Sequence, residues 1–342
     1  MITVERGLQP ARGTRTTHVT DHRKEGNPDR ALTAAIAVCA LVGAVTVGAT
    51  LTLSTRGDAG TRGAIPRMAT EEYGRRLIAQ TSELIGPDHT DPTMRYSGTR
   101  IACASCHLGA GTEPGTLSLL QSAANYPRFS GRDGGTRDLL DRINGCMTRS
   151  MSGRELPRDS PEMIAMAAYI TSLGDLYGAM GEGQRKASEQ PAFATPNRGA
   201  DLQAGEAVFT ERCAICHGPD GTGLRATPNP LHGYVFPPLW GPDTFNNGAG
   251  MHRVLTAARF IKAKMPLGQA DLTDDQAFDV AAYINAQPRP QMANLEQDYP
   301  DRSTKPIDGA YGPFADDFPL EQHRFGPFQP IEGYYKSLKK PK

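Results

Sequence analysis

Two short stretches decide the fold of this chain: CASCH at Cys103–His107 and CAICH at Cys213–His217. Both have the form C-x-x-C-H, which is the attachment signature of c-type haem. Each thiol of such a motif can add to a vinyl group of the porphyrin, and the adjacent histidine then lies under the iron as its proximal ligand. A thioredoxin-like redox pair or half of a zinc site would explain one motif. Two copies in a repeated frame favour two covalently attached haem c groups.

Each motif supplies three residues to its haem, two thiols for attachment and one imidazole for the iron. The predicted haem-binding residues are Cys103, Cys106 and His107 in the first copy, and Cys213, Cys216 and His217 in the second.

The chain around these motifs is an internal repeat. A helical pattern begins at Glu71 ahead of the first motif, and DLQAGEAVFTER leads directly into the second. Each copy closes with another helix, predicted over 159–173 and 272–287, in which AMAAYI and DVAAYI occupy equivalent places. Few segments read as strands. We therefore predict a mainly α protein with two tandem haem domains, at 68–177 and 200–288, joined through long irregular loops.

The C-terminal arm, residues 289–342, shows neither a helical nor a strand period. It is rich in proline and in aromatic residues, and the aromatic residues argue against simple disorder. We expect an irregular arm that packs over the two domains and ends in the mobile basic segment KSLKKPK.

The N-terminal region contains an uncharged run of 23 residues, 31–53. A helix of this length, rising about 1.5 Å per residue, crosses the roughly 30 Å hydrocarbon core of a bilayer. More basic residues precede the run than follow it, so the positive-inside rule leaves 1–30 in the cytoplasm and exports the rest. A cleaved signal peptide is the alternative, although no A-x-A site follows the run cleanly. We expect one transmembrane anchor and a protein on the periplasmic side of the cytoplasmic membrane.

Overall charge is balanced, with 37 basic and 37 acidic residues. This balance gives no reason to expect nucleic acid or a polybasic membrane surface as a partner.

The second haem iron needs a sixth ligand, and Met265 is the first candidate. It lies 52 residues after Cys213 and is followed by proline, as in the Met-Pro loop of class I cytochromes c. A thioether ligand raises the haem potential, which suits the exit of electrons. Met251 is the weaker rival. The adjacent Lys264 is either a surface lysine or, when deprotonated, an alternative ligand that exchanges with the methionine.

The first copy has no Met-Pro pair, but it has an isolated cysteine in INGCMTRS, Cys146, 43 residues after Cys103. A thiolate is a strong axial donor, so Cys146 is either a haem ligand or a buried, inert thiol. Positive charge favours the thiolate form, and guanidinium groups also bind tetrahedral oxyanions. Six arginines lie close to Cys146 in sequence: Arg128, Arg132, Arg137, Arg142, Arg149 and Arg154. Most of them are expected to be solvated loop arginines. The methionines of this copy are Met147, Met151, Met163 and Met166.

The chain resembles the tetrathionate-forming thiosulfate dehydrogenases, which are dihaem c-type cytochromes. The matching stretches are RIACASCH, YPRFSGRDG, DRINGCMTRSMSGR, FPPLWGPDTFNNGAG, IKAKMPLG and YPDRSTKP. The resemblance extends from about Glu71 into the C-terminal arm, and INGC with FSGR is its most specific part. It implies two class I cytochrome c domains. It also implies His107 and Cys146 on the first haem, and His217 with Met265 or Lys264 on the second.

The resemblance further implies a substrate site at the first haem, formed by Cys146, Arg132 and Arg142, with Ser150 as a less secure member. Two thiosulfates would be joined there into tetrathionate, with Cys146 as a transient sulfur carrier. Electrons would pass to the second haem and then to an acceptor such as a small cytochrome c or a membrane oxidase. A membrane-anchored dihaem electron relay and a tetrathionate reductase are the alternatives. A relay needs no thiolate beside arginines.

Overall fold

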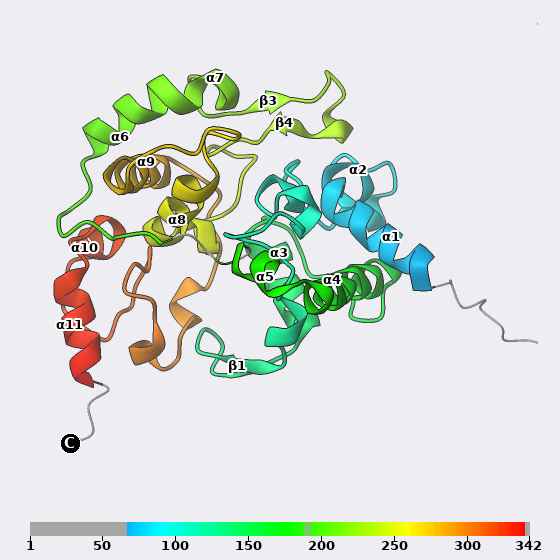
Figure 1. Cartoon of the computed structure of the whole chain (residues 1–342), viewed down its shortest axis with the longest axis horizontal. Helices are drawn as coiled ribbons and strands as arrows, with labels where there is room; N and C mark the ends of the chain where they lie inside the picture. Colours follow the sequence, from blue (N-terminus) through cyan, green and yellow to red (C-terminus); the bar gives the residue numbers. More distant parts are fainter. Residues whose placement is uncertain (1–66, 188, 190–191, 339–342) are drawn as a thin grey trace, which may run out of the picture. The chain divides into compact units, whose positions relative to one another are not determined.

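Two pairs of crossing helices organise the part of the chain that the structure describes, residues 67–187, 189 and 192–338 of a computed structural model (Figure 1). In the first pair α1 packs on α4, and in the second α6 packs on α9. The helices are α1 (Arg67–Ala79), α2 (Thr81–Ile85), α3 (Leu139–Arg149), α4 (Pro161–Ala179), α5 (Glu182–Ala187), α6 (Leu202–Val208), α7 (Ala214–His217), α8 (Val254–Lys264), α9 (Asp274–Ala286), α10 (Leu320–Phe325) and α11 (Gln329–Leu338). The predicted mainly helical architecture is confirmed.

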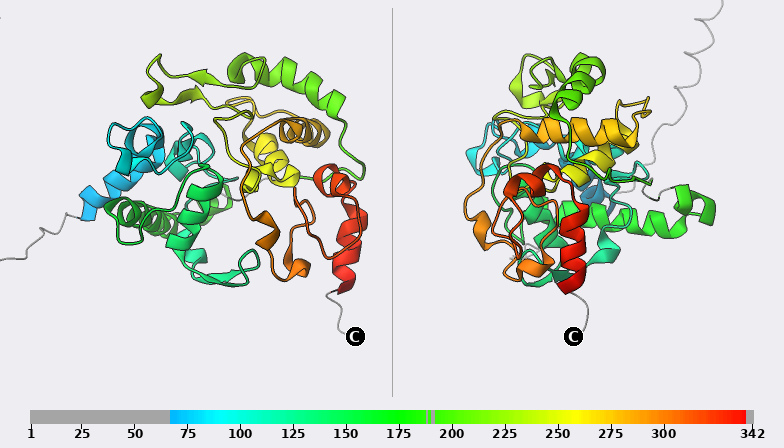
Figure 2. Two further views of the ribbon diagram at one scale, coloured as in Figure 1. Left: turned by 180° about the vertical axis from the view of Figure 1, so that it is seen from behind. Right: turned by 90° about the vertical axis from the view of Figure 1, so that its left-hand side faces the viewer.

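Strands are short and lie in two antiparallel hairpins within the described residues. One hairpin pairs β1 (Arg128–Ser130) with β2 (Gly135–Arg137). The other pairs β3 (Leu224–Arg225) with β4 (Tyr234–Phe236). Figure 2 shows both as loop-like extensions beside the helices. Neither hairpin forms a sheet that could support a core, so the cores are helical.

Glycine makes both helix crossings possible. A Cβ atom at Gly74 of α1 would lie 2.0 Å from the carbonyl oxygen of Ala165 in α4. At the second crossing, a Cβ atom at Gly205 of α6 would lie 2.2 Å from the carbonyl oxygen of Asp279 in α9. No side chain fits into either space, because non-bonded carbon contacts are normally about 3.5–4.0 Å. The repeat inferred from the sequence is therefore a repeat of packing as well.

The two copies differ in how they reach the haem motif. In the second copy α6 continues through a π-helical turn, Phe209–Cys213, directly into α7. In the first copy α2 ends at Ile85, and an irregular segment separates it from the short 3-10 turn Cys103–Ser105.

The first core contains the four methionines of the first copy. Met147, Met151, Met163 and Met166 are each at most 2% exposed, and they pack with residues of α1 and α4 such as Leu77. These side chains are structural.

The C-terminal arm differs from the irregular segment that we expected, since it contains α10 and α11. Phe325, Phe328, Ile331 and Tyr335 pack against Val254 and Phe278 of the second copy. Ile331 and Tyr335 are one helical turn apart, and the surrounding prolines and aromatics obscure this brief period in the sequence. The expected mobile tail begins in α11 at Lys336–Leu338, and its remaining residues lie outside the described part.

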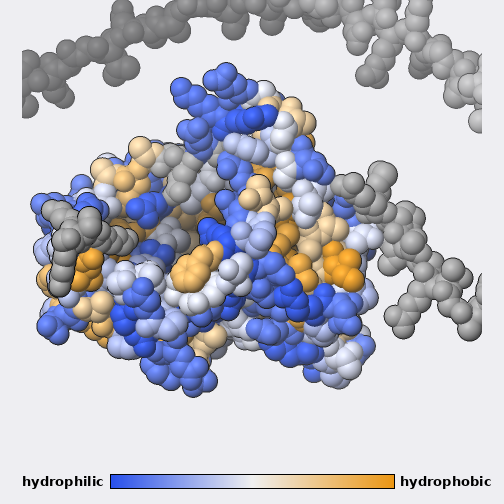
Figure 3. Space-filling model, turned by 90° about the horizontal axis from the view of Figure 1, so that it is seen from below, coloured by the Kyte–Doolittle hydropathy of each residue, from blue (hydrophilic) through white to orange (hydrophobic). Residues whose placement is uncertain are grey.

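The chain divides into two units, Met1–Thr61 and Arg62–Lys342. The first unit, with the expected cytoplasmic segment 1–30 and the expected anchor 31–53, lies outside the described residues. Among the residues that are described, no helix is both long and apolar enough to cross a bilayer. Hydrophilic residues cover most of the face seen in Figure 3, in keeping with a mean hydropathy of −0.45.

Candidate active site and haem-binding motifs

Two parts of the chain hold the first C-x-x-C-H motif in place: α2, and the loop that follows the motif and contains Leu117. The Cys103 N–H donates to Thr81 Oγ1 at 3.0 Å, and that hydroxyl lies 3.4 Å from Cys103 Sγ. Nδ1 of His107 donates to the Leu117 carbonyl oxygen at 2.7 Å, which leaves the Nε2 lone pair free. Burial lowers the pKa of His107, so the imidazole stays neutral. A neutral, oriented imidazole is the form that binds iron.

The second motif repeats this arrangement. Nδ1 of His217 donates to the Pro237 carbonyl oxygen at 2.7 Å, and burial again lowers the pKa of the imidazole. Two thiols and one neutral, oriented imidazole in each copy are the donor set that covalent attachment of haem c requires. The residues of both motifs therefore fit the cofactor.

The four thiols of the motifs, Cys103, Cys106, Cys213 and Cys216, are half-buried and free. Burial raises the pKa of Cys103 to about 11 and that of Cys106 to about 12. Burial also raises the pKa of Cys213 to about 11, and the neighbouring Cys216 adds to this shift. Cys216 lies in α7, directly before His217. Among the described residues all four thiols are free, so both pairs are available for thioether bonds to haem.

The candidates for the distal ligand of the second haem lie in different surroundings. Met265 follows the last residue of α8, and both Met265 and Met251 pack in the same apolar cluster as Cys213 and Trp240. Lys264 points elsewhere. Its Nζ donates to the Pro114 carbonyl oxygen at 2.5 Å and lies 3.3 Å from Glu113 Oε1, in the loop that follows the first motif. The structure thus brings both methionines to the second haem motif and commits the lysine to a contact with the first copy.

Cys146 lies in the last turn of α3. Asp138 begins this helix through a capping box with Asp141, and the Ser150 N–H donates to the Cys146 carbonyl oxygen at 2.8 Å at its end. The charge of Cys146 is the main cause that raises the pKa of Arg142. After burial, Cys146 is also a further cause that raises the pKa of Cys103. Ile143 and Met147, the neighbours of Arg142 and Cys146 in α3, pack in the same core as Cys103. This packing places α3 beside the first haem motif.

Arg142 also influences the proximal histidine. Burial is the main cause that lowers the pKa of His107, and the positive charge of Arg142 lowers it further. Arg142 and Cys146 lie one helical turn apart in α3, whereas His107 lies 35 residues before Arg142, and folding brings this helix to the first haem motif.

The other arginines near Cys146 separate into two groups. Arg154 lies over the Tyr96 ring at 3.9 Å, Arg137 pairs with Asp133 at 2.5 Å, and Arg128 lies over Tyr126 at 5.1 Å. These three have structural partners of their own.

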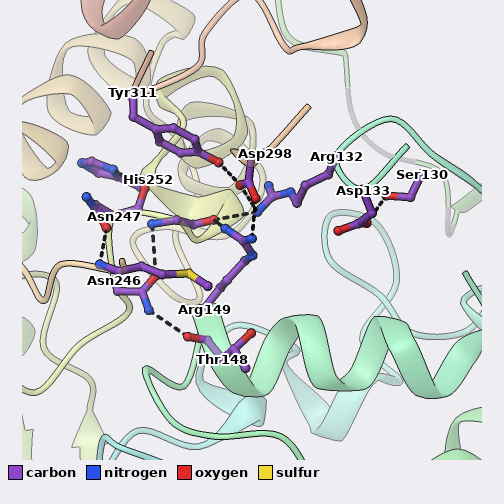
Figure 4. A network of polar contacts seen from close by, with 12 residues as sticks. Ser130, Arg132, Asp133, Thr148, Arg149, Asn246, Asn247, His252, Asp298 and Tyr311 are labelled. Carbon is purple, nitrogen blue, oxygen red and sulfur yellow. Dashed lines mark hydrogen bonds and ion pairs between the residues drawn. The ribbon is translucent and has the colours of Figure 1, made fainter. Parts of the chain in front are cut away.

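Arg132 and Arg149 form the second group and converge on one carboxylate of the C-terminal arm, Asp298 (Figure 4). The Arg132 Nη1 lies 3.6 Å from Asp298 Oδ2, and the Arg149 Nη2 lies 2.8 Å from Oδ1. Both guanidinium groups also donate to the Gly248 carbonyl oxygen, at 2.9 Å and 3.4 Å. The sequence does not single out Asp298 or Gly248, because each lies about 100 or more residues from the arginines. Asp298 lies outside the family stretches, and Gly248, within FPPLWGPDTFNNGAG, contributes only its backbone.

A polar cavity of about 530 Å³ lies on another side of α3. Its lining includes Arg137, Asp141 and Arg158, but neither Cys146 nor any residue of the two haem motifs. Its charges compensate each other, since Arg158 pairs with Asp141 at 2.5 Å and with Asp138. We do not assign this cavity to the substrate.

Comparison with known proteins agrees with this geometry. The family model "SoxA/TsdA, cytochrome c domain" matches residues 95–175, and "Cytochrome C oxidase, cbb3-type, subunit III" matches residues 200–284. A thiosulfate dehydrogenase of Allochromatium vinosum is 40% identical over 222 residues, which cover 64% of this chain and 77% of the relative. A thiosulfate dehydrogenase of Stutzerimonas stutzeri is 38% identical over 224 residues, which cover 65% and 70%. This chain belongs to the thiosulfate dehydrogenase family of cytochromes c.

The family assignment extends to a solved structure. The thiosulfate dehydrogenase (TsdBA) of Marichromatium purpuratum, in its as-isolated form, has a TM-score of 0.58 and 34% identity. The match covers 70% of this chain and 51% of that chain. As a member of the family, the protein carries two covalently bound haem c groups, one in each cytochrome c domain, and this prediction is confirmed.

Proposed function

We propose that this chain is a thiosulfate dehydrogenase that joins two thiosulfates into tetrathionate at Cys146. What supports the proposal is the packing of α3, which carries Cys146 and Arg142, against the core that holds Cys103 of the first haem motif. An electron relay would need neither Cys146 nor Arg142 there. His107 and Cys146 would hold the first haem, and His217 with Met265 would hold the second. When bound, these haems supply iron centres that take up electrons one at a time.

The reaction is balanced around the sulfur of Cys146. Its thiolate bonds to the sulfane sulfur of one thiosulfate, and this oxidative step releases two electrons. A second thiosulfate then attacks the same sulfane sulfur, so a new S–S bond forms, tetrathionate leaves and the Cys146 thiolate is restored. No proton is consumed or released. The attacking group in such exchange reactions is a thiolate.

Arginines offset the main electrostatic obstacle, which is the repulsion between two dianions. Arg142 lies at Cys146, and the charge of Arg132 is felt at Arg142. A guanidinium group pairs well with the sulfonate end of thiosulfate, leaving its sulfane end directed toward the thiolate. Ser150, at the end of α3, is a candidate for a further hydrogen bond to substrate.

We also propose that the protein works outside the cytoplasm, anchored by residues 31–53, and that it passes electrons to a small cytochrome c or a membrane oxidase. The uncharged run and its flanking basic residues support the anchor. Fractionation of the native host tests this point: an anchored protein stays with the membrane after a salt wash, whereas a cleaved one is released with the periplasm.

The decisive experiment uses residues from Thr61 onward, produced in a host that attaches haem c. Thiosulfate and ferricyanide are supplied, and tetrathionate is counted against electrons accepted. One tetrathionate per two electrons supports the dehydrogenase. A protein with both haems that reduces no ferricyanide with thiosulfate, but exchanges electrons with cytochromes, is a relay instead.

Two variants test the residues. Cys146→Gly is expected to abolish turnover while both haems remain attached, and retained thiosulfate oxidation would rule out the sulfur-carrier mechanism. Arg142→Gln is expected to lower kcat/KM by about 100-fold, because a charge-assisted contact to an anion is lost. Arg154→Gln is its matched control, since Arg154 is in the same stretch but donates to the carbonyl oxygens of Thr93 and Arg95.

A further inference from the structure

The structure joins the C-terminal arm to Arg132, one of the proposed substrate arginines, through one buried carboxylate. Asp298 is 8% exposed and lies in the arm, yet its two oxygens are shared by Arg132, Arg149 and Tyr311 (Figure 4). The Tyr311 hydroxyl donates to Asp298 Oδ2 at 2.5 Å. One negative charge thus faces two guanidinium groups, which leaves the group of three with a net positive charge.

Three further hydrogen bonds fix the backbone at this junction. The Tyr299 N–H, next to Asp298, donates to the Arg132 carbonyl oxygen at 2.7 Å. The Asn246 N–H donates to the Arg149 carbonyl oxygen at 3.1 Å, and the Asn246 side-chain amide donates to the Thr148 carbonyl oxygen at 2.8 Å. The arm and the loop around Gly248 therefore hold both the side chain of Arg132 and the end of α3.

The contacts of Asp298 and Gly248 with Arg132 offset repulsion between neighbouring guanidinium groups. Arg132 and Arg149 both donate to the Gly248 carbonyl oxygen, at 2.9 Å and 3.4 Å, so two positive charges lie close together. Without compensation, their repulsion would turn the long Arg132 side chain away. The Asp298 carboxylate and the Gly248 carbonyl oxygen oppose such a movement, since both lie on the same Nη1 atom of Arg132.

We infer that Asp298 is a positioning residue for Arg132, which it holds beside Arg149 in the orientation that receives the anionic substrate. The inference rests on the proposed function. It gives the C-terminal arm a part in binding thiosulfate, although no residue of the arm needs to touch the substrate. A preformed site avoids the loss of arginine side-chain freedom on binding, and this advantage disappears when the carboxylate is neutralised.

The test compares two arm variants of the haem-loaded protein, Asp298→Asn and Asp308→Asn. Asp308 is a matched control because it is another buried arm carboxylate paired with an arginine, Arg253, at 2.5 Å. It also accepts the Leu255 N–H at 3.1 Å, so its loss loosens the arm without touching Arg132. For each variant, KM and kcat for thiosulfate are measured with ferricyanide, and Tm is measured by circular dichroism.

Asp298→Asn is expected to raise KM for thiosulfate by about tenfold or more, with a smaller change in kcat, because ground-state binding is lost. Asp308→Asn is expected to lower Tm with KM unchanged. An unchanged KM in Asp298→Asn would overturn the inference while leaving the dehydrogenase intact. A lower KM would also overturn it, since Asp298 would then only repel the substrate. An equal rise in both variants would assign the effect to a loosened arm. A wild-type protein that forms no tetrathionate would remove the proposed function and this inference with it.

Discussion

Replacing Gly74 by alanine should separate α1 from α4. The added Cβ would lie 2.0 Å from the Ala165 carbonyl oxygen and 2.8 Å from Tyr169 Cβ. Ordinary contacts of this kind are about 3.5 Å or longer, so the two helices must move apart by about 1.5 Å. Backbone atoms lie on one side of the clash, and rotation of a side chain cannot relieve it.

The cost follows from the surroundings of this crossing. Overpacking a rigid core typically costs about 1–3 kcal/mol, and we expect the upper end here because backbone must shift. Tyr169 also donates to the Ala110 carbonyl oxygen at 3.0 Å, in the loop after the first haem motif. Movement of α4 therefore disturbs the haem loop as well. A loss of about 3 kcal/mol corresponds to a fall in Tm of about 6–12 °C for a protein of this size.

The assay is thermal unfolding of the haem-loaded protein, followed by far-ultraviolet circular dichroism and by the Soret band. Gly178→Ala is the matched control, because it lies in α4 and a Cβ there meets nothing within 4 Å. That variant should gain about 0.5–1 kcal/mol from the higher helix propensity of alanine. If Gly74→Ala unfolds within about 2 °C of the wild type, the close approach of the helices does not limit stability and the reasoning is wrong.

Three further predictions concern other parts of the molecule. Met265→Gly should alter the reduced spectrum of the second haem and slow transfer to the acceptor, whereas an unchanged spectrum would identify Met251 or Lys264 as the ligand. Asn246→Ala removes the donor to the Thr148 carbonyl oxygen at the end of α3, and urea unfolding should show a loss of about 1–3 kcal/mol; a change below about 0.5 kcal/mol would mean that water replaces the side chain. Burial lowers the pKa of Lys305 from 10.5 to about 8, so the unfolded chain binds more protons between these values and the free energy of unfolding should rise with pH across that window. The rise should reach at most about 3 kcal/mol, and it should vanish in Lys305→Met when urea unfolding is compared from pH 7.5 to 10.

The sequence by itself determined the haem chemistry of this protein. C-x-x-C-H is a local motif in which five consecutive residues provide both thiols and the imidazole, so no distant contact is needed to read it. The last helix of each copy, α4 and α9, could be predicted for a similar reason, because the signals that start a helix are local. Ser160 and Thr273 cap the N-termini of these helices in the structure. Cys146 was also recognisable, because its family context is a continuous stretch of sequence.

The tertiary structure decided which partners the arginines near Cys146 contact. Six lie near it in sequence, and the family resemblance named Arg132 and Arg142 among them, but spacing alone gave no partner for any of the six. Packing directs Arg154 and Arg137 to structural partners, and it joins Arg149 to Asp298 across 149 residues of chain. A long flexible arginine side chain is oriented by the hydrogen-bond acceptors that the fold brings close to it. Those acceptors are distant in the sequence, so spacing along the chain does not predict them.

Dependence on distant contacts also explains why the helices of the C-terminal arm and the partner of Lys264 could not be predicted. The apolar residues of α11 cover only about two turns, so their period becomes visible only once α8 and α9 provide the surface against which they pack. By sequence Lys264 was a surface lysine by default and a haem ligand as the alternative, whereas its contact with Pro114 depends on how the two haem domains meet. The haem-attachment chemistry could therefore be predicted from short local motifs. The contacts between the two domains and the C-terminal arm could be identified only in the folded chain.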